Sequence, residues 1–103
     1  MNILRPGHLY ALDHFDNKEQ PQQTLQFIEK QVNPSDGKLT TVNDGTTNEE
    51  VLLMIIDRLN FLQAKFPCRE NAIAITHVET ALLWLNKRTA GRVARGVEGQ
   101  HKA

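Results

Sequence analysis

The feature that most constrains this chain is a helix break between two long helical segments. Apolar residues recur at helical spacing from about 48 to 65 and again from about 69 to 90, with Pro67 between the two segments. Proline restricts the residue before it, so it ends the first helix. Because the connection is only a few residues long, we expect the two helices to run antiparallel as a hairpin.

The first helix is too apolar to be covered by a chain of this size. Thr47 and Glu50 have the spacing of a capping box, which predicts the helix start. The run VLLMII at 51–56 is apolar nearly all round, so it has to be covered on more than one side. One small sheet and one other helix do not supply that cover, and we therefore expect self-association.

Residues 1–44 lack helical periodicity. They contain three short segments of β-type composition that turn formers separate, and Gly37 is free to adopt a positive φ in the second turn. The three segments are residues 8–12, 24–30 and 38–42. The predicted fold is therefore α+β: a small N-terminal antiparallel β-sheet followed by an antiparallel two-helix hairpin, in a homo-oligomer.

The length of 103 residues suits a single domain over 1–103. Within it we expect a β-rich part over 1–46, the helical hairpin over 47–97 and a tail over 98–103. No apolar run approaches membrane-spanning length, the start of the chain lacks the apolar core of a signal peptide, and the single Cys68 rules out an intrachain disulfide. These features predict a cytosolic setting and no membrane partner.

Three arginines near the C-terminus are the strongest indication of a binding site. Arg88, Arg92 and Arg95 are spaced i, i+4 and i+7, which on a helix gives one stripe that continues the line of the apolar face. No acidic residue lies between them, and the last 17 residues carry a net charge of +4. Unpaired guanidiniums in that position suit a phosphate or carboxylate from outside the chain. The alternative is a solvated tail, and a helix end at Gly91 would move Arg92 and Arg95 onto a loop.

Three other residues have the chemistry to bind an anion or a base. Arg69 opens the second helix, where free backbone amides favour negative charge, and Thr76 follows seven residues later on the same face. Phe61, near the end of the first helix, has an aromatic ring that can stack on a purine. Each has a structural alternative: an ion pair of Arg69 with Glu70 or Asp57, a Thr76 hydroxyl bonded to the carbonyl four residues earlier, and core packing of Phe61.

The sequence contains no catalytic constellation. The four histidines are scattered, and none has another His or a Cys at metal-ligand spacing. A pair of Cys68 with His77 would lack a third group to orient it, so we expect Cys68 to be a buried structural residue. No phosphate-binding loop is present. We predict no catalytic residue, no metal and no cofactor.

The 60 residues from Asp44 to the C-terminus resemble the phage Thoeris anti-defence sponges, which share the helical hairpin with the anti-CBASS sponges. The most specific segments are GTTNEE at 45–50, PCRENAIAIT at 67–76 and RGVEG at 95–99. The segments HLYAL and QFIEK are similar to the N-terminal sheet of that family. The resemblance implies a non-enzymatic homohexamer that sequesters cyclic nucleotide immune signals, in the cytoplasm of the infected bacterial host.

The resemblance also implies two binding sites. The first takes glycocyclic ADP-ribose molecules and cyclic dinucleotides, with an aromatic residue stacked on a base, an amide for polar contacts and two arginines on phosphates: Phe61, Asn71, Arg88 and Arg92. The second lies on a threefold axis and takes cyclic trinucleotides, with Arg69 on phosphate and Thr76 as a hydrogen-bonding residue.

Two other functions are open at this point. One is a phosphodiesterase that degrades the same signals, although the lack of metal ligands or a His pair argues against it. The other is a small nucleic-acid-binding module that uses the basic C-terminus. Such proteins are usually basic overall, whereas this chain is acidic outside its last 17 residues. We therefore expect no DNA or RNA partner.

Overall fold

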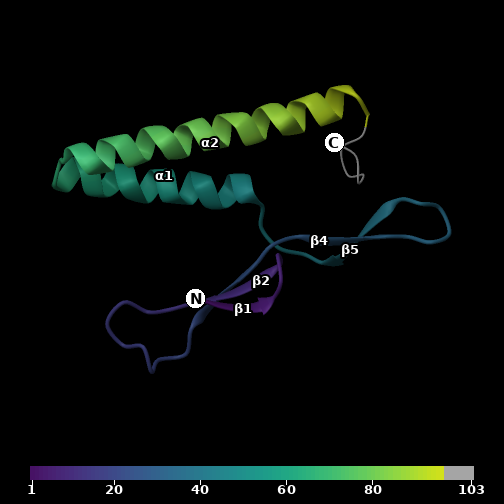
Figure 1. The fold of residues 1–103 in the computed structure, drawn as a ribbon, viewed down its shortest axis with the longest axis horizontal. Helices are drawn as coiled ribbons and strands as arrows, with labels where there is room; N and C mark the ends of the chain where they lie inside the picture. Colours follow the sequence, from purple (N-terminus) through teal and green to yellow (C-terminus); the bar gives the residue numbers. More distant parts are fainter. Residues whose placement is uncertain (97–103) are drawn as a thin grey trace. The chain divides into compact units, whose positions relative to one another are not determined.

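The computed structural model of the protein describes residues 1–96 (Figure 1). These residues belong to two compact units, Met1–Thr47 and the unit that begins at Asn48. The first unit consists of β-strands and the second of two helices, so the predicted α+β fold is confirmed. The predicted tail over 98–103 and the predicted end of the hairpin at 97 lie outside the described residues.

The second unit is the predicted hairpin of α1 (Asn48–Lys65) and α2 (Arg69–Ala94). The side chain of Gln63 closes the turn between them. Its Oε1 accepts a hydrogen bond from the Cys68 amide and its Nε2 donates one to the Cys68 carbonyl, both at 3.0 Å. The Cys68 carbonyl also accepts a hydrogen bond of 3.2 Å from the Ala72 amide, so the Gln63 side chain ties the end of α1 to the first turn of α2.

Cys68 caps the start of α2. Its backbone is extended, and its Sγ accepts a hydrogen bond of 3.4 Å from the Asn71 amide, one of the orphan donors at the start of the helix. The thiol is exposed, so the expectation that Cys68 is buried is wrong. A side chain that caps an exposed helix start has to stay at the surface, which explains the exposure.

The helix α2 continues through Gly91, and the predicted end near residue 90 is wrong. A helix-interior glycine costs about 1 kcal/mol relative to alanine, which the flanking turns of a long helix can absorb. The chain leaves the helix at Gly96, whose φ is +70° and whose amide bonds to the Val93 carbonyl at 3.0 Å. Arg92 therefore lies on the helix, and Arg95 is its C-cap.

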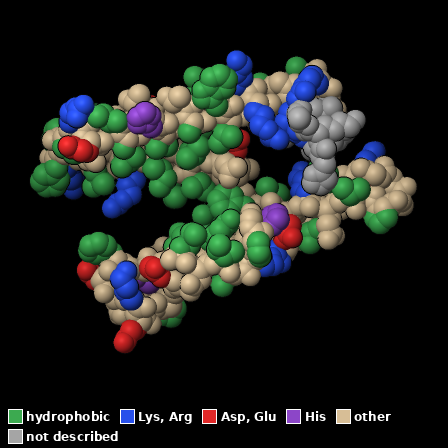
Figure 2. Space-filling model, viewed as in Figure 1, with side chains coloured by type: hydrophobic (Ala, Val, Ile, Leu, Met, Phe, Trp, Pro, Cys, Tyr) green, Lys and Arg blue, Asp and Glu red, His purple; other side chains and the backbone are tan. Residues whose placement is uncertain are grey.

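The two helices differ in length, and α1 is poorly covered. With 26 residues against 18, α2 is about 12 Å longer, and its last two turns extend beyond the start of α1. No residue of α1 is fully buried, and Leu53, Met54 and Ile55 are exposed. Figure 2 shows hydrophobic side chains at the surface of both helices. Within residues 1–96, no helix is long and apolar enough to cross a membrane.

The first unit holds two small antiparallel sheets where a single sheet was predicted. One sheet has the order β1-β2-β3, and the other pairs β4 with β5. Strand β1 was missed in the sequence because it is exposed along its whole length and runs directly into the Pro6-Gly7 turn. The strands are β1 (Asn2–Arg5), β2 (Leu9–Leu12), β3 (Gln23–Gln26), β4 (Glu29–Val32) and β5 (Leu39–Asn43).

The predicted strand 24–30 is interrupted at Phe27 and Ile28, which separates β3 from β4. There the chain meets the segment at 45–46: the Thr46 amide bonds to the Gln26 carbonyl and the Ile28 amide to the Thr46 carbonyl, both at 2.9 Å. A Cβ at Gly45 would overlap the backbone of Gln26, so only glycine permits this approach.

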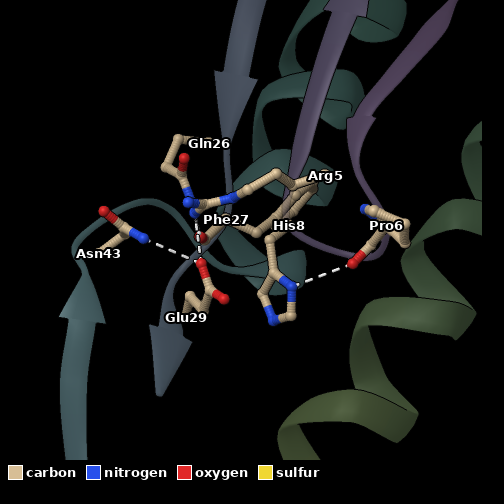
Figure 3. A network of polar contacts seen from close by, with 7 residues as sticks. All are labelled: Arg5, Pro6, His8, Gln26, Phe27, Glu29 and Asn43. Carbon is tan, nitrogen blue, oxygen red and sulfur yellow. Dashed lines mark hydrogen bonds and ion pairs between the residues drawn. The ribbon is translucent and has the colours of Figure 1, made fainter. Parts of the chain in front are cut away.

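A polar network around Glu29 joins the two sheets of the first unit (Figure 3). The Glu29 carboxylate, at the start of β4, accepts a hydrogen bond of 2.9 Å from Asn43 at the end of β5. It also pairs with Arg5 at the end of β1. The hydrogen bond from Asn43, assisted by the charge of Arg5, holds the pKa of Glu29 below its ordinary value of 4.5.

We predict that acid loosens this network. Because the pKa of Glu29 is lowered in the folded state, its contribution to stability is present above pH 4.5 and is lost as the pH falls through the lowered value. The protection of the β4 and β5 amides against hydrogen exchange, taken relative to the intrinsic exchange rate at each pH, should fall in that range. Glu29→Gln should exchange faster at neutral pH and lose most of the acid dependence, whereas Glu19→Gln, in the loop after β2, should behave as wild type. Equal acid dependence in both variants would contradict the assignment.

Candidate ligand-binding site

The turn end of the hairpin presents Phe61, Asn71 and Arg69. Phe61 is 57 % exposed and the Lys65 ammonium lies 4.7 Å from the centre of its ring, so Phe61 is not a core residue of this chain. Asn71 is half-buried in the first turn of α2. Arg69 is exposed, and within the described part of the chain no ion pair joins it to Glu70 or Asp57. An aromatic face and a cation are therefore available to a ligand here.

Thr76 lies two turns after Arg69, and both side chains are exposed. The Thr76 hydroxyl donates to the Ala72 carbonyl at 3.2 Å, which is the structural alternative foreseen for this residue. Its oxygen keeps a lone pair for an incoming donor. To donate to a phosphate, the hydroxyl would have to give up its bond to the helix.

The arginines at the other end of α2 are not equivalent, which corrects the expectation of three unpaired cations. Arg88 is exposed. Arg92 is only 4 % exposed and is engaged within the chain. The Nε of Arg95 donates to the Gly91 carbonyl at 3.3 Å. Helix C-terminal carbonyls attract such cations, which accounts for the position of Arg95. Arg95 is exposed as well, so Arg88 differs from it in making no side-chain hydrogen bond or ion pair among the described residues.

Sequence reasoning overlooked an exposed aromatic residue next to Arg88. Trp84 is 61 % exposed, and the Lys87 ammonium lies 4.9 Å from the centre of its ring. An exposed tryptophan with cations three and four residues later was a usable signal. It was overlooked because Trp84 belongs to an apolar run, ALLWL at 81–85, which by itself suggests a buried helix face. Figure 2 shows lysine and arginine side chains gathered at this end of α2.

The two ends of the hairpin are too far apart to share one ligand. Asn71 and Arg88 are 17 residues apart on the same helix, which is about 25 Å. Phe61 lies at the turn end with Asn71. One copy of the chain therefore cannot bring Phe61, Asn71 and Arg88 together, although it does place Arg69 near Thr76.

The described residues show no further chemical centre. Within 1–96, no group of three or more His, Cys, Asp and Glu side chains could hold a metal ion. Cys68 is occupied as a helix cap and His77 is exposed on α2. The described part of the hairpin thus offers cations and aromatic faces at its surface.

These features define the class of the protein as a helical-hairpin domain with an exposed cationic and aromatic surface. The model of the Acb2/Tad1 hairpin domain matches residues 23–90, and the chain belongs to this family. A curated relative, Thoeris anti-defense 1 of Bacillus phage SBSphiJ7, is 51 % identical over 78 residues. That match covers 64 % of this chain and 55 % of the relative, so the chain spans little more than half of that protein. The resemblance to the Thoeris anti-defence sponge family is thereby confirmed.

Proposed function

We propose that this protein binds and sequesters cyclic nucleotide immune signals without cleaving them, and so blocks Thoeris immunity, with CBASS immunity as a second target. It would act in the cytoplasm of the infected bacterial host, without a cofactor and without binding DNA, RNA or a membrane. Membership of the Acb2/Tad1 hairpin family and the similarity to a protein named for Thoeris anti-defence support this role. Capture without turnover needs phosphate clamps and base stacking, and the hairpin exposes groups of both kinds.

The first proposed site takes glycocyclic ADP-ribose molecules and cyclic dinucleotides. Phe61 stacks on a base, Asn71 makes polar contacts, and Arg88 and Arg92 hold phosphates. The exposed ring of Phe61 and the exposed guanidinium of Arg88 support these roles. Since Arg92 is buried and engaged, it reaches a phosphate only if ligand binding displaces its present contacts.

The separation of about 25 Å between Asn71 and Arg88 carries the proposal that this site is shared between copies of the chain. Two hairpins packed side by side in opposite directions bring the turn end of one next to the arginine end of the other. The exposed Leu53, Met54 and Ile55 of α1 provide apolar surface for such packing. We propose a homohexamer as the assembly.

The second proposed site takes cyclic trinucleotides through Arg69 and Thr76. Both side chains are exposed on the first turns of α2, where the helix dipole and the free amides favour a phosphate. A threefold axis through this point would present three copies of Arg69, which matches the three phosphates of the ligand.

The two sites should respond separately to substitution. We predict that Arg88→Ala or Arg92→Ala abolishes capture of the ADP-ribose-type signal, because a charge-assisted contact to phosphate is lost, and leaves trinucleotide binding intact. Arg69→Ala should have the opposite effect. Isothermal titration calorimetry with one ligand of each type measures this, with Arg95→Ala as a control of equal charge change. If any one variant lost the binding of both ligands equally, the two-site model would be contradicted.

A mixing experiment tests whether the first site is shared. Phe61→Ala and Arg88→Ala proteins should each fail to capture a cyclic dinucleotide. If the two residues come from different copies, refolding the variants together at equal amounts should restore about a quarter of the sites. A mixture of Phe61→Ala with Asn71→Ala is the matched control, because both residues lie at the turn end of one copy, and it should restore none. No recovery in the first mixture would mean that the site is not shared in this way.

Sequestration differs from degradation in what is left afterwards. We predict that a signal incubated with the protein is recovered unchanged after heating the complex, as seen by mass spectrometry. Native mass spectrometry of the unheated complex would give the stoichiometry and the number of copies. A linear or shortened nucleotide after heating, absent from a heated sample without protein, would instead support the phosphodiesterase.

A further inference from the structure

Trp84 is an exposed aromatic residue whose position is unexplained by the packing of the hairpin. It is the only tryptophan of the chain and is 61 % exposed on α2. The Lys87 ammonium lies 4.9 Å from the centre of its ring. The exposed ring and the ammonium beside it together offer a stacking face and a positive charge, which suit a ligand that carries a base and a phosphate.

The surroundings of Trp84 on the helix favour an anion. Its neighbours one turn away are Thr80 and Ala81 on one side and Lys87 and Arg88 on the other, and none of them is acidic. Arg88 is exposed and lies one helical turn after Trp84, on the same side of α2. A second copy of the chain docked here by its own Trp84 would bring the same cations together, and like charges repel. Charge repulsion thus argues against a symmetric contact of two copies through Trp84, and the two cations beside the ring suit a small anion such as a phosphate.

Gly91 lies on the same side of α2 as Trp84 and Arg88, seven residues after Trp84. Glycine is a poor helix former, and a Cβ at this position would meet nothing within 4 Å among the described residues. The described part of the chain therefore gives no steric reason for glycine here. Glycine is used where a ligand has to come close to the backbone, and this surface lies on the part of α2 that extends beyond α1.

We infer that Trp84, Arg88 and Gly91 form one nucleotide-binding surface, in which Trp84 stacks on a purine ring, Arg88 holds the neighbouring phosphate and Gly91 lets the ligand approach the helix. This inference rests on the proposed function and adds Trp84 and Gly91 to its first site. The bicyclic ring of tryptophan matches a purine in size, and the three residues lie within about 11 Å along the helix.

The single tryptophan allows a direct test on the full-length chain. Cyclic di-AMP should quench and shift the Trp84 fluorescence, whereas pyrophosphate, which has phosphates and no base, should not. Trp84→Ala should weaken the binding of cyclic di-AMP about tenfold or more, in line with the loss of one stacked base, and Trp84→Phe should retain part of it. Leu83→Ala is the matched control, because Leu83 is 68 % exposed on the adjacent position and should bind as wild type.

Gly91→Ala gives a test in which two measurements move in opposite directions. Alanine should raise the thermal unfolding temperature, since it meets open space and favours the helix. It should nevertheless weaken binding of cyclic di-AMP, because the methyl group occupies the surface that the ligand approaches. A variant that is more stable and binds equally well would remove Gly91 from the surface.

The outcomes separate this inference from the proposed function. Normal binding by Trp84→Ala, with loss of binding in Arg88→Ala, would overturn the role of Trp84 and leave the first site standing. Normal binding by Arg88→Ala would overturn the first site itself. No binding of cyclic di-AMP by the wild type would overturn this inference, whereas the calorimetry with the ADP-ribose-type signal would still decide the first site. A smaller assembly of Trp84→Ala by native mass spectrometry would make Trp84 an interface residue and would also overturn the inference.

Discussion

The short turn at residues 66–68 is the constraint on which the hairpin depends. Pro67 ends α1, and the Gln63 side chain bonds both the amide and the carbonyl of Cys68, so that three residues suffice to reverse the chain. The Cys68 thiol then caps the first turn of α2. With the turn set in this way, every residue of α2 has a defined distance from the turn, and the candidate site residues divide into two groups at opposite ends.

The unequal lengths of the helices explain why the group of residues at the arginine end of α2 is exposed. Because α2 is about 12 Å longer than α1, the residues from Arg88 onward lie on a part of α2 that α1 does not cover. Arg88 stays exposed there, next to Trp84 and Gly91, while Arg95 turns back onto the last carbonyls of the helix. The apolar surface of α1 remains in need of cover. A second copy that covers it in the opposite direction would also complete the proposed first site.

Local sequence signals predicted the helical unit better than the sheet unit. Both helix starts and the proline break depend on contacts within a few residues, so they could be recognised without the rest of the chain. The end of α2 could not, because glycine only weakens a helix and the real stop depends on the backbone conformation of Gly96. The division of 24–30 into β3 and β4 depends on Thr46 and Gly45, which are distant in sequence. No pattern within residues 24–30 indicates that these two residues lie beside the segment.

The candidate site shows the same division between local and distant causes. Residue type alone indicated which side chains could bind phosphate or stack on a base, and helical spacing indicated that the arginines share one side of α2. The sequence by itself thus determined the α+β class, the hairpin and the chemistry of the candidate binding residues, because these follow from composition and from periodicity over a few turns. Only the tertiary structure decided that Arg88 is accessible while Arg92 is buried, that Trp84 faces outward, and that Asn71 and Arg88 lie about 25 Å apart. Burial and separation are properties of the whole packed chain, and no local pattern contains them.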